Sequence, residues 1–461
     1  MSPLHDFALW EPLLRLLRSA HAQRLAAPGG QVVGRIGRHS WSVPLPRPRR
    51  VPGRALQTSD NQEEHDAVER LRKALHEADV DGLVFALELP ADGSVLLRLL
   101  DYGPAVDAGS GYHRPATLRL VEGARPEPWR RLPEPVPGAR PAPSADPALL
   151  ERILRERLPD AIGATEEEIT AAEVRLGLTL PEEVKALYRV TRERHEDSTD
   201  DLAGIDRALH AVGFEPNAVE HLFVADTSER HFDWAYSAME AARTDPDAAV
   251  QDLAGSPGWI VLGLTGNGDR LAVDLTPGPR GHLGQIIVLS QEEGIGAVVV
   301  ADSLTALVTA PRWSRPRGRD HGAPPQVARV HHGSPGGIGA AARPELEVLG
   351  LGACHDEPFG LAPLLGLPRL RSLSAYGGSL ADPSEIGGLT GLEFLELTPA
   401  DWRAVLAADA VPAGLLAAGI DAKDGDDLRG TVALANEILA RWNRPLIGET
   451  VLRGDLGPLL P

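Results

Sequence analysis

The chain has 461 residues, of which 43% are apolar, and at roughly 100–200 residues per domain this length predicts two to four domains. Its net charge of −19 argues against a nucleic-acid-binding protein, because neutralising phosphates requires a basic surface. Cys354 is the only cysteine, which excludes an internal disulfide, and no apolar run approaches the roughly 18 residues that cross a bilayer. We therefore expect a cytoplasmic protein without membrane contact.

Residues 1–140 are predicted to form a basic α+β domain. The first 58 residues hold nine arginines against Asp6 and Glu11, a bias typical of a solvated arm or of a surface for an anionic partner. Residues 61–78 have the apolar spacing of a helix, and GLVFALEL and SVLLRLLDY, separated by PADG, predict a β-hairpin. The proline-rich stretch ARPEPWRRLPEPVPGARPAPSADP is predicted to be a linker that ends near residue 147.

The next predicted domain, residues 148–312, is acidic, with 29 acidic and 14 basic residues between positions 151 and 312. Thr165 and Glu168 have the spacing of a capping box, which predicts the start of a helix. Gly177 is expected to end that helix, and Pro181 is expected to open the next one.

The stretch TGNGDRLAVDL, residues 265–275, raises the question of a ligand-binding loop. None of the three lysines follows a glycine, which excludes a P-loop, and LAVDL alternates like a strand where a dinucleotide site requires a helix. Asn267, Asp269 and Asp274 are too few oxygen ligands for a calcium loop. Asn-Gly between two apolar runs instead predicts a hairpin turn, and we expect residues 259–289 to form a β-meander.

Four blocks of this domain carry a family resemblance: IGATEEEITAAEVRLGLTLPEEVKALY, WIVLGLTGNGDRLAVDL, GQIIVLSQEE and VVADSLTALV. In this order they resemble the signature blocks of the SUKH superfamily, which groups a yeast cell-wall synthesis regulator with bacterial immunity proteins. The resemblance covers about residues 148–310. It implies an α+β fold with helices on a mainly antiparallel sheet, and no catalytic activity. The residues that match recurrent family positions, most of them expected to be structural, are Gly163, Leu180, Pro181, Trp259, Gly268, Asp269, Asp274 and Gly284.

One departure from the family pattern follows the helix that bears Tyr188. An acidic insertion, RERHEDSTDD, opens about sixty residues of extra material there. Such a run is typical of a solvated loop, and our hypothesis is that it also contacts a basic partner, because acidic side chains steer association with a cationic surface. The candidate contact residues are Glu193, Glu196, Asp197, Asp200 and Asp201.

The C-terminal third contains leucines at a regular step. After a Pro/Gly-rich linker at 313–343, LEVLGL, LRSLSA and LEFLEL start 24 and 22 residues apart, a spacing that favours a leucine-rich-repeat-like array at 344–400. We expect these three segments to be adjacent parallel strands that share one core. Residues 401–461 are predicted to be a helical cap.

Recognised catalytic motifs are absent from the sequence, which contains neither G-x-S-x-G nor H-E-x-x-H. His331, His332, Cys354 and His355 lack the spacing of a zinc module, so we expect no metal and no cofactor. The interpretation that follows is a non-enzymatic protein-binding module. The resemblance favours an immunity protein that blocks a basic, nuclease-like toxin domain. A scaffold or regulatory protein without a toxin partner, and a hydrolase with an unrecognised site, are the alternatives.

Overall fold

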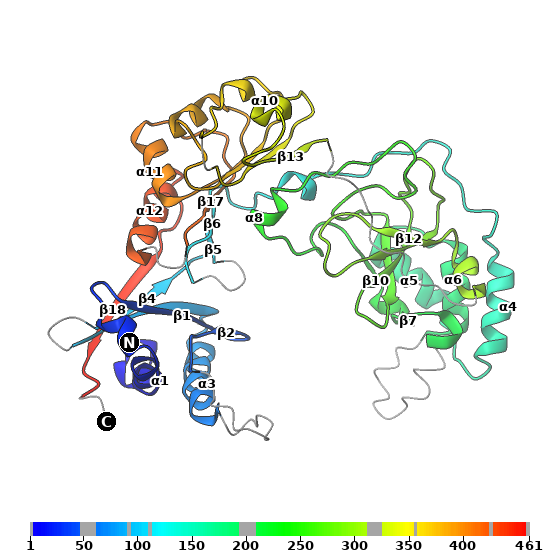
Figure 1. Ribbon diagram of the computed structural model, residues 1–461. Coiled ribbons are helices and arrows are strands. Elements are labelled where there is room, and N and C mark those ends of the chain that lie inside the picture. Colours follow the sequence, from blue (N-terminus) through cyan, green and yellow to red (C-terminus); the bar gives the residue numbers. More distant parts are fainter. Residues whose placement is uncertain are drawn as a thin grey trace, which may run out of the picture. The chain divides into compact units, whose positions relative to one another are not determined.

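The computed structural model describes residues 3–46, 61–89, 94–108, 113–192, 209–310, 325–354, 357–423 and 427–457 (Figure 1). The chain divides into two compact units. Unit 1 comprises Met1–Ala124, Val330–Ala342 and Gly350–Pro461, and unit 2 comprises Arg125–Arg329 and Arg343–Leu349. Both units combine helices with mainly antiparallel sheets, which confirms the predicted α+β class. The domain limits expected from the sequence stay predictions.

Unit 1 contains a five-stranded antiparallel sheet of order β18-β4-β3-β1-β2. Its strands are β1 (Gln31–Gly37), β2 (Trp41–Ser42), β3 (Gly82–Glu88), β4 (Val95–Asp101) and β18 (Gly448–Gly454). The helices α1 (Phe7–Ala20), α2 (Ala22–Ala26) and α3 (Gln62–Glu77) supply apolar side chains to a core shared with one face of this sheet. The expected helix at 61–78 and the hairpin that follows it are confirmed.

A second sheet has the order β13-β14-β15-β16-β17-β6-β5. Its strands are β5 (Val106–Asp107), β6 (Thr117–Arg119), β13 (Val327–Val330), β14 (Val348–Leu351), β15 (Ser372–Ala375), β16 (Phe394–Leu397) and β17 (Ala417–Ile420). The three leucine segments are neighbours, as expected, and β15, β16 and β17 pair in parallel. The predicted leucines are all buried: Leu346, Leu349, Leu351, Leu370, Leu373, Leu392, Leu395 and Leu397. The assignment of this segment to the leucine-rich repeats stays a prediction.

Helical segments precede or follow the parallel strands: α10 (Gly337–Ala341), η6 (Ala362–Leu364), η7 (Pro383–Gly388), α11 (Pro399–Ala407) and α12 (Leu428–Arg441). The C-terminal segment differs from the expected helical cap, because β17 and β18 accompany its two helices. Alanine and glycine in β17 gave no strand signal in the sequence. The described part of the expected linker at 313–343 likewise contains β13 and α10.

Unit 2 is built on a sheet of order β12-β11-β10-β9-β7, with β8 also paired to β9. The strands are β7 (Glu215–Pro216), β8 (Phe223–Val224), β9 (Trp259–Leu264), β10 (Arg270–Asp274), β11 (Gln285–Leu289) and β12 (Val298–Ala301). The helices are η3 (Glu127–Trp129), α4 (Pro147–Arg157), α5 (Glu166–Leu176), α6 (Glu182–Val190), η5 (Val219–His221), α8 (Trp234–Ser237) and α9 (Leu304–Thr309). Antiparallel pairing of β9, β10 and β11 confirms the predicted meander.

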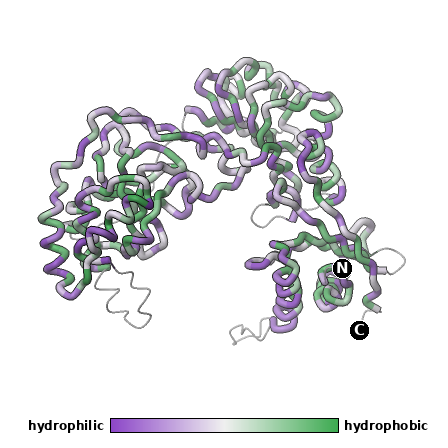
Figure 2. Tube along the Cα trace, turned by 180° about the vertical axis from the view of Figure 1, so that it is seen from behind, coloured by the Kyte–Doolittle hydropathy of each residue, from purple (hydrophilic) through white to green (hydrophobic). Residues whose placement is uncertain are grey.

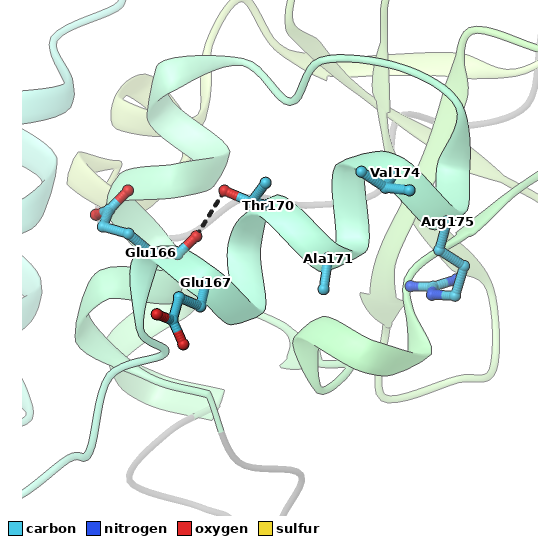
Figure 3. A pocket seen from close by; sticks show the side chains of 6 residues that line it. All are labelled: Glu166, Glu167, Thr170, Ala171, Val174 and Arg175. Carbon is cyan, nitrogen blue, oxygen red and sulfur yellow. Dashed lines mark hydrogen bonds between the residues drawn. The ribbon is translucent and has the colours of Figure 1, made fainter.

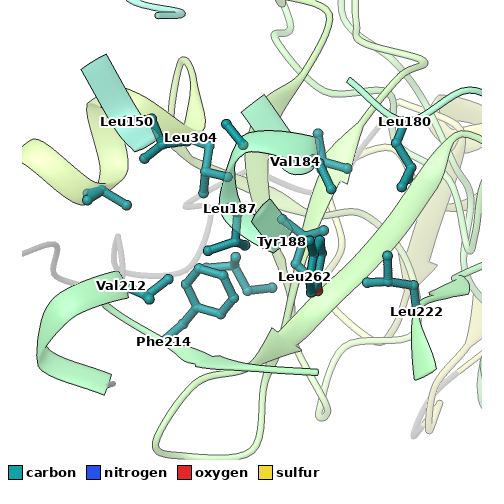
Figure 4. Close-up of a cluster of buried hydrophobic side chains, with 14 of the residues drawn as sticks. Leu150, Leu180, Val184, Leu187, Tyr188, Val212, Phe214, Leu222, Leu262 and Leu304 are labelled. Atoms are coloured by element: carbon teal, nitrogen blue, oxygen red, sulfur yellow. The ribbon is translucent and has the colours of Figure 1, made fainter. Parts of the chain in front are cut away.

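The sheet of unit 2 is buried on both faces. One face packs Ile260 and Leu262 of β9 against helices α4, α5, α6 and α9 (Figure 4). The other face packs Trp259 and Val261 of the same strand against residues of the surrounding loops, including Val250. Burial on both faces explains why β9 and β11 are continuous apolar runs. In Figure 2 the apolar residues of unit 2 accordingly gather in its interior.

Local sequence signals set the ends of the helices of unit 2. The Thr165 hydroxyl accepts a hydrogen bond from the Glu168 amide, and the Glu168 carboxylate accepts one from the Thr165 amide, which confirms the capping box. Gly177 ends α5 in the left-handed conformation, at a φ of 71°. Pro181 is the N-cap residue of α6, as expected.

The proline-rich stretch before residue 147 differs from the expected linker, because from Arg125 on it is part of unit 2 and packs against the rest of that unit. Trp129 is buried, and its indole N–H donates to the carbonyl oxygen of Arg230 at 3.1 Å. Farther along, the amide of Glu134 donates to the side chain of Gln251 at 2.8 Å. Proline excludes regular structure in this stretch but does not prevent packing through its side chains and carbonyl oxygens. The amino-acid composition of this stretch therefore did not predict that it packs.

Candidate functional site

The acidic insertion singled out in the sequence lies outside the described residues. Glu193, Glu196, Asp197, Asp200 and Asp201 all fall between positions 193 and 208. The chain enters this segment at Arg192, whose guanidinium group contacts the Glu168 carboxylate of α5 at 3.2 Å. The insertion therefore starts beside the first turn of α5, and its role in binding stays a prediction.

Ion pairs join helix α5 to helix α6 and hold the pair as one platform. The Glu166 carboxylate lies 2.6 Å from the Arg189 guanidinium, and the Glu173 carboxylate lies 3.0 Å from the Lys185 ammonium. The hydrogen bond from Arg189 lowers the pKa of Glu166, so this carboxylate is ionised at neutral pH. Exposed pairs of this kind contribute little to the free energy of unfolding, and their main effect here is to fix the orientation of α5.

The outer side of α5 carries an open hollow of about 610 Å³ (Figure 3). It is lined by Glu166, Glu167, Thr170, Ala171, Val174 and Arg175. Four of these, at positions 167, 170, 171 and 174, have the spacing i, i+3, i+4, i+7 that puts side chains on one face of a helix. This group of six residues is called the α5 face below.

The α5 face contains an exposed valine. The Val174 side chain is 78% exposed, although Ile169 and Ala172 of the same helix are buried in the core. Ile162, which precedes the helix, is 58% exposed. Glu166 and Glu167 supply carboxylates to the α5 face in the first turn of the helix, about two turns before Val174. Such an arrangement can bind a protein partner through apolar contact surrounded by polar groups.

Arg175 lies at the C-terminal end of the α5 face, and hydrogen bonds to the backbone fix its side chain. Its guanidinium group donates to the carbonyl oxygens of Leu222 at 2.7 Å and Val219 at 3.3 Å, which belong to η5 and its end. The orientation of Arg175 is therefore set before any partner arrives. The sequence did contain a signal for this surface, because Val174 is an apolar residue outside the helical stripe that Ile169 and Ala172 form.

The stretch TGNGD forms a hairpin turn between β9 and β10, as the sequence predicted. The amide of Thr265 donates to the Asp269 carbonyl oxygen at 2.8 Å, and Gly268 has a φ of 86°. The buried Asp269 carboxylate accepts hydrogen bonds from the Gln291 amide at 3.1 Å and from the Asn267 side chain at 3.2 Å. The hydrogen bonds of Asp269 therefore stabilise the turn.

Asp274, at the end of β10, is a fully buried carboxylate. It accepts hydrogen bonds from the Trp259 indole at 3.1 Å and from the Gln285 side chain at 2.9 Å. Burial raises its pKa to about 6, and the hydrogen bonds from Gln285, Thr276 and Trp259 limit the rise. The Asp274 carbonyl oxygen also accepts from the amide of Gly284. This cluster ties together β9, β10 and the turn before β11.

The remaining family-pattern residues lie around the ends of α5 and α6. A side chain at Gly163 would stand 2.0 Å from the Arg189 carbonyl oxygen, so only glycine fits there. Leu180 is buried, and its amide donates to the Glu173 carboxylate at 2.8 Å just before Pro181 opens α6. The structure thus gives these residues contacts within the fold, away from the α5 face.

A second hollow, of about 340 Å³, lies between the hairpin turn and the loop after β11. It is lined by Glu229, Arg230, His231, Gly268, Arg270, Leu289, Ser290, Gln291, Glu292, Glu293 and Gly294. The buried Arg230 guanidinium donates to the carbonyl oxygens of Glu293 at 2.8 Å and Gly296 at 3.4 Å. Burial lowers the pKa of Arg230 to about 10, so it remains a cation at neutral pH. Two arginines against three glutamates leave a formal charge of only −1, which does not make this hollow a strong ion site.

The described residues form neither a metal site nor a membrane-spanning helix. Among the described residues, no three His, Cys, Asp or Glu side chains come together in a way that could hold a metal ion. The Cys354 thiol donates to the Glu357 carbonyl oxygen, and His355 lies outside the described residues. In the part of the chain that the structure covers, every helix is too short or too polar to cross a bilayer.

Comparison with known proteins supports the resemblance seen in the sequence. The SMI1 / KNR4 family (SUKH-1) matches residues 163–310, about a third of the chain. This range contains α5, α6, the hairpin and α9.

Three fungal relatives give the match a functional context. A "Cell wall biosynthesis/cell cycle regulator smi1" of Schizosaccharomyces pombe is 31% identical over 144 residues, which are 30% of this chain and 28% of that protein. A "Glucan synthesis regulatory protein" of Neurospora crassa is 39% identical over 67 residues, 14% of this chain and 13% of that protein. A "KNR4/SMI1 homolog" of Yarrowia lipolytica is 45% identical over 47 residues, 10% of this chain and 7% of that protein. The chain thus spans less than a third of each of these relatives.

Proposed function

Since residues 163–310 belong to the SMI1 / KNR4 family (SUKH-1), we propose that this chain is a regulatory protein that acts by binding another protein. The observation that carries the proposal is the α5 face, where an exposed valine stands among carboxylates and an anchored arginine on a platform fixed by ion pairs. Binding of another protein requires no cofactor. We propose that the protein acts in the cytoplasm.

The names of the relatives support regulation over toxin immunity. Two of them are named as regulators of glucan synthesis or of cell-wall biosynthesis, and none of the four compared is named as an immunity protein. The regulatory function, which was the first alternative from the sequence, is therefore the one proposed. A hydrolase is not the proposed function, and the only hydroxyl of the α5 face, that of Thr170, donates to the Glu166 carbonyl oxygen at 2.7 Å.

The five acids of the insertion extend this proposal. They follow Arg192, which contacts Glu168 in the first turn of α5, the helix that carries the α5 face. A partner with a basic rim around an apolar contact would match both features. In such a complex the acids would raise the rate of association, and Val174 would slow dissociation.

Val174→Lys tests the proposal. Lysine favours a helix more than valine does, and a cation near a helix C-terminus is stabilising, so α5 should remain folded while its apolar contact is replaced by charge. We expect proteins captured from a lysate of the source organism by the full chain to be depleted at least about tenfold with this variant, because a charge buried at an interface without a partner is costly.

Val121→Lys is the matched control. Val121 is 40% exposed and lies in unit 1, so the same chemical change occurs away from the α5 face. A partner that is lost with Val174→Lys and retained with Val121→Lys supports the proposal. Equal recovery of every captured protein with both variants would refute it.

A further inference from the structure

Strand β18 forms an open edge of the five-stranded sheet in unit 1. It pairs with β4 over all seven of its residues, and no other described strand lies beyond it (Figure 1). An edge of this length presents a row of backbone N–H and C=O groups that can pair with another strand. Its sequence, GETVLRG, contains no proline that would block such pairing.

The side chains of β18 separate onto two faces. Leu452 packs against the core formed with α1 and α3. Because side chains alternate along a strand, Glu449, Val451 and Arg453 lie on the opposite face. Val451 is 42% exposed there.

Acidic and basic side chains alternate in a row across this face of the sheet. The Glu88 carboxylate lies 2.9 Å from the Arg98 guanidinium, and Arg98 lies 2.6 Å from the Glu449 carboxylate. The row runs from β3 through β4 to β18 and ends with an acid. Arg453 is exposed and makes no ion pair with any residue that the structure describes.

The strand is complementary to itself in the antiparallel direction. When two copies of GETVLRG are paired with Val451 opposite Val451, Glu449 of each copy lies opposite Arg453 of the other. An antiparallel strand pair contains hydrogen-bonded and non-hydrogen-bonded residue pairs, and a two-fold axis can pass through either kind. A symmetric dimer centred on the Val451–Val451 pair is therefore possible in both cases. We propose that the chain forms a symmetric dimer in which β18 of one copy pairs with β18 of a second copy around Val451.

The dimer joins the two five-stranded sheets into one and continues the row of charges across the axis. Two Glu449–Arg453 pairs form, each beside Arg98, and the two exposed valines cover each other. Cross-strand pairs contribute about 0.2–1 kcal/mol each, and a single strand pair buries less than the roughly 1,600 Å² of a standard interface. The dimer is therefore weak and reversible, with a dissociation constant on the order of 10–100 μM.

Charge reversal on β18 provides the test. Arg453→Glu places a glutamate opposite Glu449 twice in the dimer, and Glu449→Arg places an arginine opposite Arg453 twice. Sedimentation equilibrium of the full chain, from about 1 to 300 μM, should show a dimer for the native sequence and at least about tenfold weaker association for either variant alone.

Mixing the two variants separates an interface effect from misfolding. In the mixed pair, the arginine introduced at position 449 faces the glutamate introduced at position 453. The native Glu449 of one variant also faces the native Arg453 of the other, so attraction returns at both positions. We expect the equimolar mixture to associate about as strongly as the native chain. Arg441→Glu, a change of the same charge at the end of α12, is the control and should leave association unaltered.

Several outcomes would overturn the proposal. A native chain that is monomeric across the concentration range would do so, and so would a dimer that Arg453→Glu does not weaken. A mixture that associates no better than its components would show that Glu449 and Arg453 do not face each other across the axis.

Discussion

Among the buried carboxylates of unit 2, Glu183, Asp269 and Asp274 each accept hydrogen bonds from two or more donors. Glu183 accepts from the amides of Leu304 at 3.3 Å and Thr305 at 2.9 Å, and thereby caps the start of α9 from a distant helix. A buried acid without such donors would strongly destabilise the fold. Asp269 and Asp274 could be singled out through the family resemblance, whereas nothing local distinguishes Glu183 among 65 acids.

Asp274 should make the stability of unit 2 depend on pH. Its pKa is about 6 in the folded protein and about 3.9 in an unfolded chain, so the folded state holds the proton more firmly. The resulting stabilisation is complete below about pH 4 and is lost as the pH rises through about 6, a difference of about 3 kcal/mol. The free energy of unfolding of native protein minus that of Asp274→Asn should therefore be larger at pH 4 than at pH 7.

Chemical denaturation followed by tryptophan fluorescence measures this difference, because Trp259 is hydrogen-bonded to Asp274. Comparing native and variant protein at each pH cancels the titration of the other groups. If the gap between native and variant protein were the same at both values, Asp274 would not titrate in this range.

At the scale of single elements, local sequence signals predicted the helices and the hairpin of unit 2 well. The capping box at Thr165, the left-handed Gly177 and the Asn267-Gly268 turn each depend on a few neighbouring residues, so their chemistry is visible in the sequence. The path of the proline-rich stretch was not visible, because Trp129 packs against residues about a hundred positions away. The α5 face was missed for a related reason, since exposure depends on what covers a helix.

The hairpin turn gives a sharp test at this scale. Gly268→Val forces a β-branched residue into a positive φ and brings its side chain within 3.2 Å of Gln291, so the free energy of unfolding should fall by about 1–3 kcal/mol. Gly266→Val is the matched control, because no atom lies within 4 Å of the added side chain and its φ is ordinary.

The control should change the free energy of unfolding by about 0.5 kcal/mol or less, since it adds an exposed side chain. Chemical denaturation of the two variants under the same conditions provides the comparison. An equal loss in both would mean that the turn does not depend on the conformation of Gly268.

At the scale of the whole molecule, each unit of the chain is assembled from distant segments. Strand β18 pairs with β4 across about 350 positions, and β17 pairs with β6 across about 300. No feature of the local sequence indicates either strand pairing. The prediction of consecutive, separate domains therefore could not include them. The repeated leucines did predict the parallel pairing of β15 with β16, because their spacing is regular and short-range.

The family match concerns only unit 2, and the proposed function accordingly depends on one surface of that unit. Unit 1 contains β18 and forms the proposed dimer. The two proposals are independent, because Val174 and Val451 lie in different units and each has its own variant. Loss of the dimer would leave partner binding at the α5 face unaffected, and loss of that binding would leave the dimer intact.

Hydrogen exchange with the captured partner tests the central claim most directly. Amide exchange is measured in the full chain, free and with a partner whose capture requires Val174. We predict slower exchange over Ile162 to Leu176 and over the acidic segment that begins after Arg192, with unit 1 unchanged. Protection confined to unit 1, with α5 exchanging as in the free chain, would contradict the claim that this face binds the partner.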